Sequence, residues 1–409
     1  MKSLVRHRQY LLFRTKRITI SSALVSKIVL VYRYSAITAL IALLVTFLGC
    51  DSQKNFKPNI IKGKITFNSS LEQPIIQATR VSARLKNNTA ISLDSKIIKL
   101  QPNQNLLFQD SQDLLVTNGC TGIEILPYTI QHDSQIIPQK DHAIHVDTQS
   151  CVISASKKDN MVAGVLADNT LFLYNTATKQ MIFTDKGESI YAISSLNANP
   201  VFLDTVVIFP TLDGRLSTLN IKQQKIIKNI IVNTEKFLNN IIYLQVQKDD
   251  LISATQKKLY TLTRGESYSK DLEIRDVYFD GNFIYVLSLN GIIYQLDKTL
   301  ATMQSVKLPY ANLNGIIVKE GILYTLESHG GFLIALNTNG FNYDVFKLQG
   351  FKRNATTFYT NNTFFIDNKI LNLNEPYHTT IYKIKPQTNS PTHQQLNSHQ
   401  VSPLPNKDK

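Results

Sequence analysis

The chain has 409 residues, with 44 Lys and Arg against 30 Asp and Glu, 43% hydrophobic residues, three cysteines and no tryptophan. This composition supports a globular chain with an ample hydrophobic core, and it is not that of a low-complexity protein. Three cysteines are too few for a disulfide-framework protein or a multi-cysteine zinc protein.

Residues 1–49 form the first predicted element, a leader. This segment holds eight basic residues and no acidic one, so the rest of the chain has 36 basic against 30 acidic groups. The formal charge of +14 therefore lies mostly in the leader, which weakens a nucleic-acid-binding interpretation. A charge-free run over residues 35–49 ends on Gly49. It is short for a membrane span, which needs ~20 apolar residues, and has the layout of a secretory signal.

The end of this run, Leu48-Gly49-Cys50, resembles a bacterial lipobox. The resemblance implies that Cys50 is acylated and becomes the mature N-terminus. An uncleaved N-terminal anchor is the alternative. Both readings predict a chain tethered to a bacterial membrane and facing the periplasm, with the inner or outer membrane left open.

Three further segments follow the leader. Residues 50–59 are polar and predict a tether, and residues 385–409 combine four prolines with Gln, Asn, Ser, His and Lys. Such a tail cannot bury enough apolar surface to offset its ordering entropy, so we expect it to be disordered. Between them, residues 60–384 contain short runs of Ile, Val, Leu, Tyr, Phe and Thr cut by Asn, Asp and Gly, which is the pattern of β-strands.

These runs form eight hairpin-like units. Asp213-Gly214 and Asn290-Gly291 are turns of the kind that a tight hairpin needs, because its turn takes positive φ. The turn centres fall near residues 87, 121, 168, 213, 257, 290, 330 and 367. A period of about 40 residues in strand-type sequence predicts an all-β fold, a β-propeller in which each unit is one four-stranded blade. Eight blades are preferred over seven, and a pair of β-sandwich domains is the alternative fold. A ring must close, so residues 60–67 are expected to lend a strand to the last blade, which otherwise ends at residues 380–384.

The units also share a sequence pattern. After each second strand comes Asn or Asp, a few polar residues and another apolar run, as in residues 171–183 and 216–227. These units resemble degenerate PQQ-like propeller repeats, and the architecture is similar to that of BamB-like outer-membrane assembly lipoproteins. The Trp that ends such a repeat is absent, and residues such as Ile182 and Phe346 are expected to fill its packing position.

The resemblance raises an enzymatic alternative, a PQQ-dependent or other cofactor-binding oxidoreductase that uses the propeller channel. It implies a Trp under the quinone, carboxylate and amide ligands for Ca²⁺, an Asp base and often a disulfide between adjacent cysteines. The chain has no Trp, and Cys120 and Cys151 are 31 residues apart. We therefore predict no cofactor and no catalytic residue, since a fold does not imply a function.

The remaining candidate residues are the ligand-type side chains between residues 132 and 147, two cysteines and three tyrosines. His132, Asp133, Asp141, His142, His145 and Asp147 are ligand-type residues, but the two later histidines would lie on opposite faces of a strand, so no metal site is predicted. Cys120 and Cys151 can form a disulfide outside the cytoplasm, with two buried thiols as the alternative. Tyr310, Tyr343 and Tyr359 lie near predicted loops, where amphipathic rings suit interfaces.

The sequence therefore predicts a non-enzymatic, lipid-anchored propeller that acts as a protein-interaction scaffold in the cell envelope. The expected partners are envelope or outer-membrane proteins and the membrane, not nucleic acid, with the chain a monomer within a complex. On such a scaffold the loops between strands carry the contacts.

Overall fold

The computed structural model describes residues 55–130, 136–190, 193–375 and 379–381. The predicted leader 1–49, Cys50 and the predicted tail 385–409 lie outside these residues. Apart from the short 3-10 helix η2 (Lys140–His142), the regular elements of the described chain are β-strands. No helix among the described residues has the length and apolarity that a membrane crossing needs.

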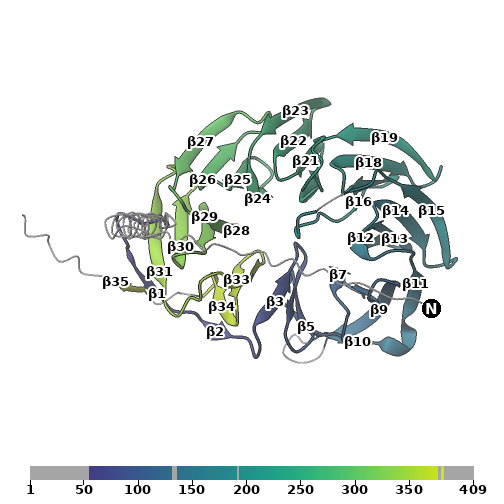
Figure 1. Ribbon diagram of the computed structural model, residues 1–409, viewed down its shortest axis with the longest axis horizontal. Helices are drawn as coiled ribbons and strands as arrows, with labels where there is room; N and C mark the ends of the chain where they lie inside the picture. Colours follow the sequence, from purple (N-terminus) through teal and green to yellow (C-terminus); the bar gives the residue numbers. More distant parts are fainter. Residues whose placement is uncertain (1–54, 131–135, 191–192, 376–378, 382–409) are drawn as a thin grey trace, which may run out of the picture. The chain divides into compact units, whose positions relative to one another are not determined.

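The strands form eight antiparallel blades arranged as a ring (Figure 1). Blade one has β3 (Ile75–Ala78), β4 (Ser82–Leu85), β5 (Thr89–Ser92) and β6 (Ile97–Lys99). Blade two has β7 (Leu106–Gln109), β8 (Asp113–Thr117), β9 (Gly122–Ile130) and β11 (Ile144–Asp147). Blade three has β12 (Val152–Lys158), β13 (Met161–Leu166), β14 (Thr170–Asn175) and β15 (Gln180–Lys186). Blade four has β16 (Val201–Phe202), β17 (Val206–Pro210), β18 (Arg215–Asn220) and β19 (Lys225–Ile231).

The second half of the ring repeats this order. Blade five has β20 (Tyr243–Gln247), β21 (Asp250–Ala254), β22 (Lys258–Thr263) and β23 (Glu266–Asp271). Blade six has β24 (Ile274–Phe279), β25 (Ile284–Ser288), β26 (Ile292–Leu296) and β27 (Thr302–Lys307). Blade seven has β28 (Leu313–Lys319), β29 (Ile322–Glu327), β30 (Phe332–Asn337) and β31 (Tyr343–Leu348). Blade eight has β32 (Thr357–Tyr359), β33 (Thr363–Ile366) and β34 (Lys369–Asn372).

Each predicted turn centre lies between the second and third strands of one blade, which confirms the eight-bladed propeller. These middle strands are packed by neighbouring blades on both faces, so they read as continuous apolar runs. All six residues of β13 except Met161 are buried, whereas the outer strand β23 alternates between exposed and half-buried positions. The sequence signal was therefore strongest where the ring is most tightly packed.

Ring closure differs in detail from the expectation. The expected closing segment, residues 60–67, contains β1 (Gly63–Ile65), which pairs in parallel with β31 on the outer edge of blade seven. β35 (Thr379–Ile381) pairs with β1 and so also extends blade seven. Blade eight is instead completed by β2 (Ser69–Ser70), which pairs with β34. Strand-type sequence shows that a segment will pair, but the partner is decided by which sheet edge the folded chain leaves open.

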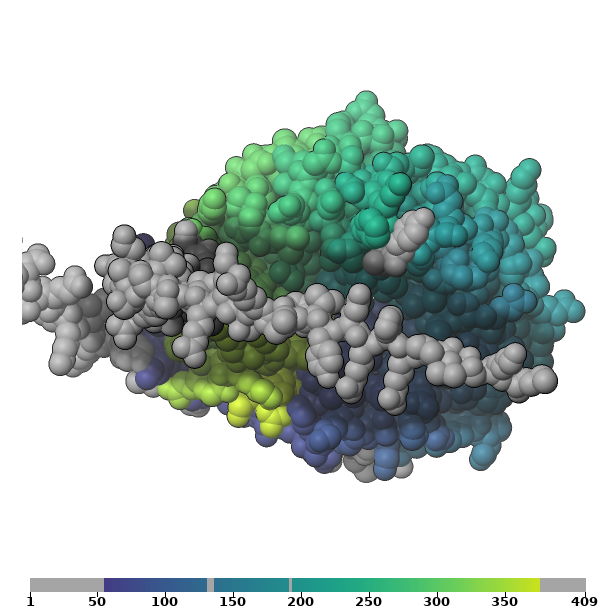
Figure 2. All heavy atoms as spheres, viewed as in Figure 1, coloured from purple at the N-terminus to yellow at the C-terminus, as the bar shows by residue number. Residues whose placement is uncertain are grey.

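The hydrophobic core lies between neighbouring blades. Ala163 and Leu173 of blade three pack with Phe209 of blade four in one cluster, and Ile75 of blade one packs with Phe365 of blade eight in another. The first and last blades are in contact in the space-filling view, where purple meets yellow (Figure 2). Ile182 and Phe346 are half-buried against such clusters, as expected for residues in place of the missing Trp.

One extra strand joins two blades. β10 (Ile136–Pro138) pairs with β9 of blade two and, through Ile136, with Ile98 of β6 in blade one. Strands of blades one and two therefore belong to a single hydrogen-bonded sheet.

Candidate functional site

From β7 round the ring to β3, the first strands of successive blades contact one another and surround its axis (Figure 1). We call the region around this axis the central channel, and a polar network crosses it. Arg80 lies between β3 and β4 of blade one, and its Nη2 is 2.9 Å from Oδ1 of Asp276 on β24 of blade six. The hydroxyl of Tyr359, on β32 of blade eight, donates to Oδ2 of the same carboxylate at 2.6 Å.

A fourth blade supports the arginine. The Arg80 guanidinium lies 5.4 Å from the centre of the Tyr243 ring on β20 of blade five. The Tyr243 hydroxyl accepts the backbone N–H of Phe279 at 3.0 Å. Residues from blades one, five, six and eight are thus held in one cluster, and the cation–π contact adds to the ion pair.

Burial and charge shift the titration of this network. Burial by itself would lower the pKa of Arg80, but the negative charge of Asp276 and its hydrogen bond outweigh burial and raise it. Burial raises the pKa of Tyr359, and the Asp276 carboxylate raises it further. The network is therefore a neutral hydroxyl and a paired cation around one carboxylate, which is how a buried charge is stabilised.

A cavity of about 430 Å³ lies beside this network, and its lining includes Arg80, Arg275, Asp276 and Tyr359. The donor set does not fit the quinone site that the PQQ resemblance implies. Asp276 is the one carboxylate among the lining residues, and Arg80 and Tyr359 already occupy its oxygens. Within the described part of the chain, no three His, Cys, Asp or Glu side chains gather as metal ligands would.

A second candidate region is the face that carries the turns between second and third strands and the connections between blades. Because successive strands of a blade run in opposite directions, these two kinds of loop lie on the same side of the ring. We call it the turn face. Large apolar side chains are exposed on it at Phe237, Leu238, Leu289 and Tyr310, with exposed fractions of 41 to 61%.

Buried asparagines hold the connection that carries Phe237 and Leu238. Asn239 donates from Nδ2 to the carbonyl oxygens of Asp213 and Asn233, at 2.8 and 3.0 Å. Asn240 is fully buried; its Oδ1 accepts the N–H of Ser194 at 2.8 Å, and its Nδ2 donates to the Leu196 carbonyl oxygen at 2.9 Å. The apolar tip is therefore supported by side-chain hydrogen bonds from two buried asparagines, although Oδ1 of Asn239 is buried without a hydrogen-bond partner.

The predicted Asp213-Gly214 turn contributes to this support. Gly214 has φ +84°, and a Cβ there would lie 2.3 Å from Nδ2 of Asn239. Only glycine allows both the turn and the close approach of the asparagine. A cavity of about 560 Å³ adjoins this turn and is lined by residues such as Glu188, Arg215 and Lys236. Arg215 forms ion pairs with Glu188 and with Asp213, the latter at 3.4 Å.

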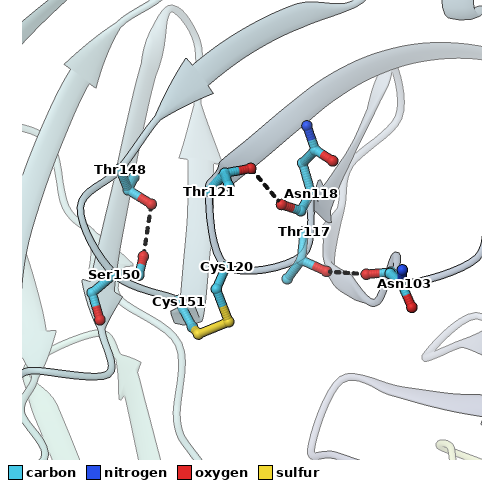
Figure 3. The surroundings of a disulfide bond; sticks show 8 residues. All are labelled: Asn103, Thr117, Asn118, Cys120, Thr121, Thr148, Ser150 and Cys151. Carbon is cyan, nitrogen blue, oxygen red and sulfur yellow. Dashed lines mark hydrogen bonds between the residues drawn. A yellow bond between two sulfur atoms is a disulfide. The ribbon is translucent and has the colours of Figure 1, made fainter.

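A disulfide lies on the same face (Figure 3). It joins Cys120, in the turn between β8 and β9 of blade two, to Cys151, in the connection that leads to blade three. Hydrogen bonds hold both loops: Thr121 Oγ1 donates to the Asn118 carbonyl oxygen at 2.8 Å, and Thr148 Oγ1 donates to that of Ser150 at 2.7 Å. The bond thus ties two neighbouring blades together.

The other sequence candidates are distributed differently. Cys50, His132 and Asp133 lie outside the described residues. His142 belongs to η2 rather than to a strand, and His145 on β11 lies 3.5 Å from Glu124. Tyr310 and Tyr343 are exposed, whereas Tyr359 is half-buried, belongs to the channel network and lines the axial cavity. An interface role for these three rings stays a prediction.

Sequence reasoning missed Arg80, Asp276, Asn239 and Asn240. Two signals were available. Arg275-Asp276 is a charged pair inside an otherwise apolar strand run, and Asn239-Asn240 directly precedes the apolar start of a blade. Both are polar residues where packing predicts apolar ones, which marks a paired or functional group.

The chain was compared with protein-family models and with known protein sequences. No protein-family model matches the chain. The plasminogen-binding protein PgbB from two Helicobacter pylori strains, J99 and 26695, is 33% and 34% identical to it over 347 residues. These alignments cover 75% of this chain, and the chain spans 64% of the length of these relatives.

Solved structures share the fold. BamB from Moraxella catarrhalis matches with a TM-score of 0.54 at 12% identity, covering 76% of this chain and 96% of BamB. The C-terminal WD40 domain of Sif2 matches with a TM-score of 0.52 at 10% identity, covering 77% of this chain and 99% of that domain. The described chain is thus a β-propeller similar to BamB, and at these identities the likeness shows the fold alone.

Proposed function

We propose that this chain is a non-enzymatic protein-interaction scaffold of a bacterial cell envelope, and that it binds its partner through the turn face. The observation that carries the proposal is the exposed pair Phe237 and Leu238 on a connection held by the buried Asn239 and Asn240. Exposed aromatic and aliphatic side chains on a rigid support are typical of binding hot spots, because little entropy is lost when they are buried.

The first partner to test is plasminogen. The Helicobacter pylori relatives are named for binding it, and they are 33% and 34% identical to this chain. Since this chain spans 64% of their length, the proposal is that the propeller itself carries a plasminogen-binding surface.

The proposal predicts that immobilised plasminogen binds the purified chain, and that the double variant Phe237→Ser with Leu238→Ser binds at least tenfold more weakly, by ~1.4 kcal/mol or more. A matched control is Ile227→Ser with Met303→Ser, which removes exposed apolar side chains from the outer strands β19 and β27. Biolayer interferometry measures the affinities, and serum albumin serves as the control ligand.

The outcomes separate the parts of the proposal. Equal binding by the double variant and the wild type would exclude the Phe237 connection as the contact. If plasminogen does not bind, cross-linking from position 237 in native envelopes tests an envelope or outer-membrane assembly partner, as the likeness to BamB suggests. Position 303 is the control for that experiment.

Membrane anchoring is the second part of the proposal. The Leu48-Gly49-Cys50 ending supports acylation of Cys50 in the cell envelope. Cys50→Ser should abolish fatty-acid labelling and release or mislocalise the chain. Labelling that survives this substitution would contradict a lipoprotein anchor, and fractionation with surface proteolysis separates a periplasmic position from a surface position.

An oxidoreductase that uses the channel is the competing function. The Arg80–Asp276–Tyr359 network argues against it, because the carboxylate in the axial cavity is already paired. A ligand that binds only the native state must raise the melting temperature. Adding PQQ and Ca²⁺ is therefore expected to leave the melting temperature unchanged, and a rise would favour the enzyme.

A further inference from the structure

Arg275 faces the axial cavity from the wall of the channel. It belongs to β24, where the pairing with β25 shifts register between Ile274 and Asp276. Arg275 is the extra residue at this bulge, and it is one of the residues that line the cavity of about 430 Å³. Bulges re-aim a side chain, and this one turns a charged residue of an apolar strand toward the axis.

Arg275 forms no ion pair with the described residues. Its neighbour Asp276 is engaged by Arg80, Tyr359 and the N–H of Val277. Nε of Arg275 is buried without a hydrogen-bond partner, and the described residues form no ion pair with this guanidinium. Burial lowers the pKa of Arg275, and the charge of Asp276 only partly opposes this. Arg275 is half-buried, so its guanidinium is partly desolvated, and an anionic partner at the axis would stabilise it.

The cavity has one net positive charge. The charged groups among its lining residues are Arg80, Arg275 and Asp276. The rest of the lining includes neutral groups that can hydrogen-bond, such as Gln77, Ser195 and Gln256. The volume is within the range of small-molecule sites, and such sites place a few polar groups around one charged anchor.

We propose that the axial cavity binds a carboxylate through Arg275. The planar guanidinium matches a carboxylate with two parallel N–H···O bonds. A monoanion neutralises the single excess charge, whereas a phosphate dianion would reverse it. The carboxylate belongs either to a small free acid or to the C-terminus of a peptide. This site is separate from the turn face and does not depend on the proposed function.

The test uses the purified full chain and calorimetric titration with acetate, succinate, inorganic phosphate and a tripeptide as free acid or amide. Sodium chloride keeps the ionic strength constant. A carboxylate probe should bind the wild type, and Arg275→Gln should bind it at least tenfold more weakly. Arg275→Lys keeps the charge but loses the planar guanidinium, so its affinity for the carboxylate should lie between those of the wild type and Arg275→Gln. Arg264→Gln removes an exposed arginine and should bind like the wild type.

Each outcome bears on the proposal. Binding of the free-acid tripeptide but not of its amide or the small acids identifies a peptide C-terminus, and binding of the small acids identifies a free metabolite. No carboxylate binding by the wild type, equal binding by Arg275→Gln, or tighter binding of phosphate would overturn the proposal. Without an anion, Arg275→Gln should melt no lower than the wild type, because it removes a desolvated charge. A lower melting temperature would also overturn the proposal, since Arg275 would then have a structural partner.

Discussion

The wall of the central channel and the turn face differ in the chemistry of the side chains that they present. In the channel, Arg80, Asp276 and Tyr359 come from three blades and pair with one another across the axis. On the turn face, Asn239 and Asn240 satisfy the backbone of the connections, while Phe237 and Leu238 remain exposed. The channel network thus pairs charged and polar groups of several blades, whereas the turn face exposes apolar side chains, and we propose that these bind a partner.

Two arginines sharpen this comparison within the channel itself. Arg80 and Arg275 line the same cavity, but only Arg80 has a carboxylate partner. The lesson is that position on the axis does not decide the role of a charged residue. Its pairing does, because a desolvated charge is stabilised only where an opposite charge lies beside it.

The largest expected effect comes from breaking the channel network. Asp276→Ala should lower the free energy of unfolding by about 3–5 kcal/mol, because it leaves the buried Arg80 without its counter-ion. Urea denaturation measures the change. Asp271→Ala removes an exposed carboxylate that pairs with Lys258 and should cost less than about 1 kcal/mol. Equal effects of the two substitutions would mean that the axial network contributes no more than a surface pair.

The disulfide tests whether the turn face is held covalently. Cys151→Ser should cost about 2–4 kcal/mol, since the bond closes a loop between residues 31 apart in sequence. Cys120→Ser removes the same bond and should cost a similar amount, with the double variant no less stable than either. Thermal melts with and without reductant make the measurement. A reductant that still destabilises Cys151→Ser would contradict this assignment, because the described chain has no other disulfide.

Removing an asparagine that supports the turn face should lower the free energy of unfolding by a smaller amount. Asn240→Ala leaves the Ser194 N–H and the Leu196 carbonyl oxygen without their partner and should cost about 1–3 kcal/mol. In limited proteolysis, the connection before β20 should also be cleaved faster in Asn240→Ala than in the wild type. Asn229→Ala, at an exposed position of β19, is the control and should stay within about 0.5 kcal/mol. If Asn240→Ala behaves like this control, the connection is supported by packing alone.

The smallest predicted effect concerns pH on the opposite face. Burial by itself would raise the pKa of Asp250, but Lys298, at 2.6 Å, and Thr263, at 2.5 Å, together lower it. A lowered folded pKa stabilises the protein above the unfolded pKa of about 3.9, and this is lost as pH falls through the folded value. The difference in free energy of unfolding between wild type and Asp250→Asn should therefore narrow as the pH falls from 5 toward 3, because acid protonates the Asp250 carboxylate and removes its charge.

Urea midpoints at several pH values measure this narrowing. Asp249→Asn, at the exposed neighbouring position, is the matched control. A difference between wild type and Asp250→Asn that is constant with pH would contradict the assignment of the effect to the Asp250–Lys298 pair.

Much of the fold could be predicted because it depends on local pattern. Turn pairs such as Asp213-Gly214 and the apolar run of β13 each occupy a few consecutive residues, and their repetition implies a ring. The candidate sites could not be predicted in this way. Arg80 and Asp276 are 196 residues apart, and Asn240 holds Ser194 from 46 residues away. No period or spacing in one sequence identifies such partners.

The sequence by itself determined the blade count, the middle strands, the two cysteines available to pair and the lipobox-like ending at Cys50. Only the tertiary structure decided that β2 rather than β1 completes the last blade, that Tyr359 faces the axis, and that Arg80 is paired while Arg275 is not. The physical reason is that strand formation follows from the alternation of neighbouring residues, whereas pairing across a ring depends on where closure brings distant side chains.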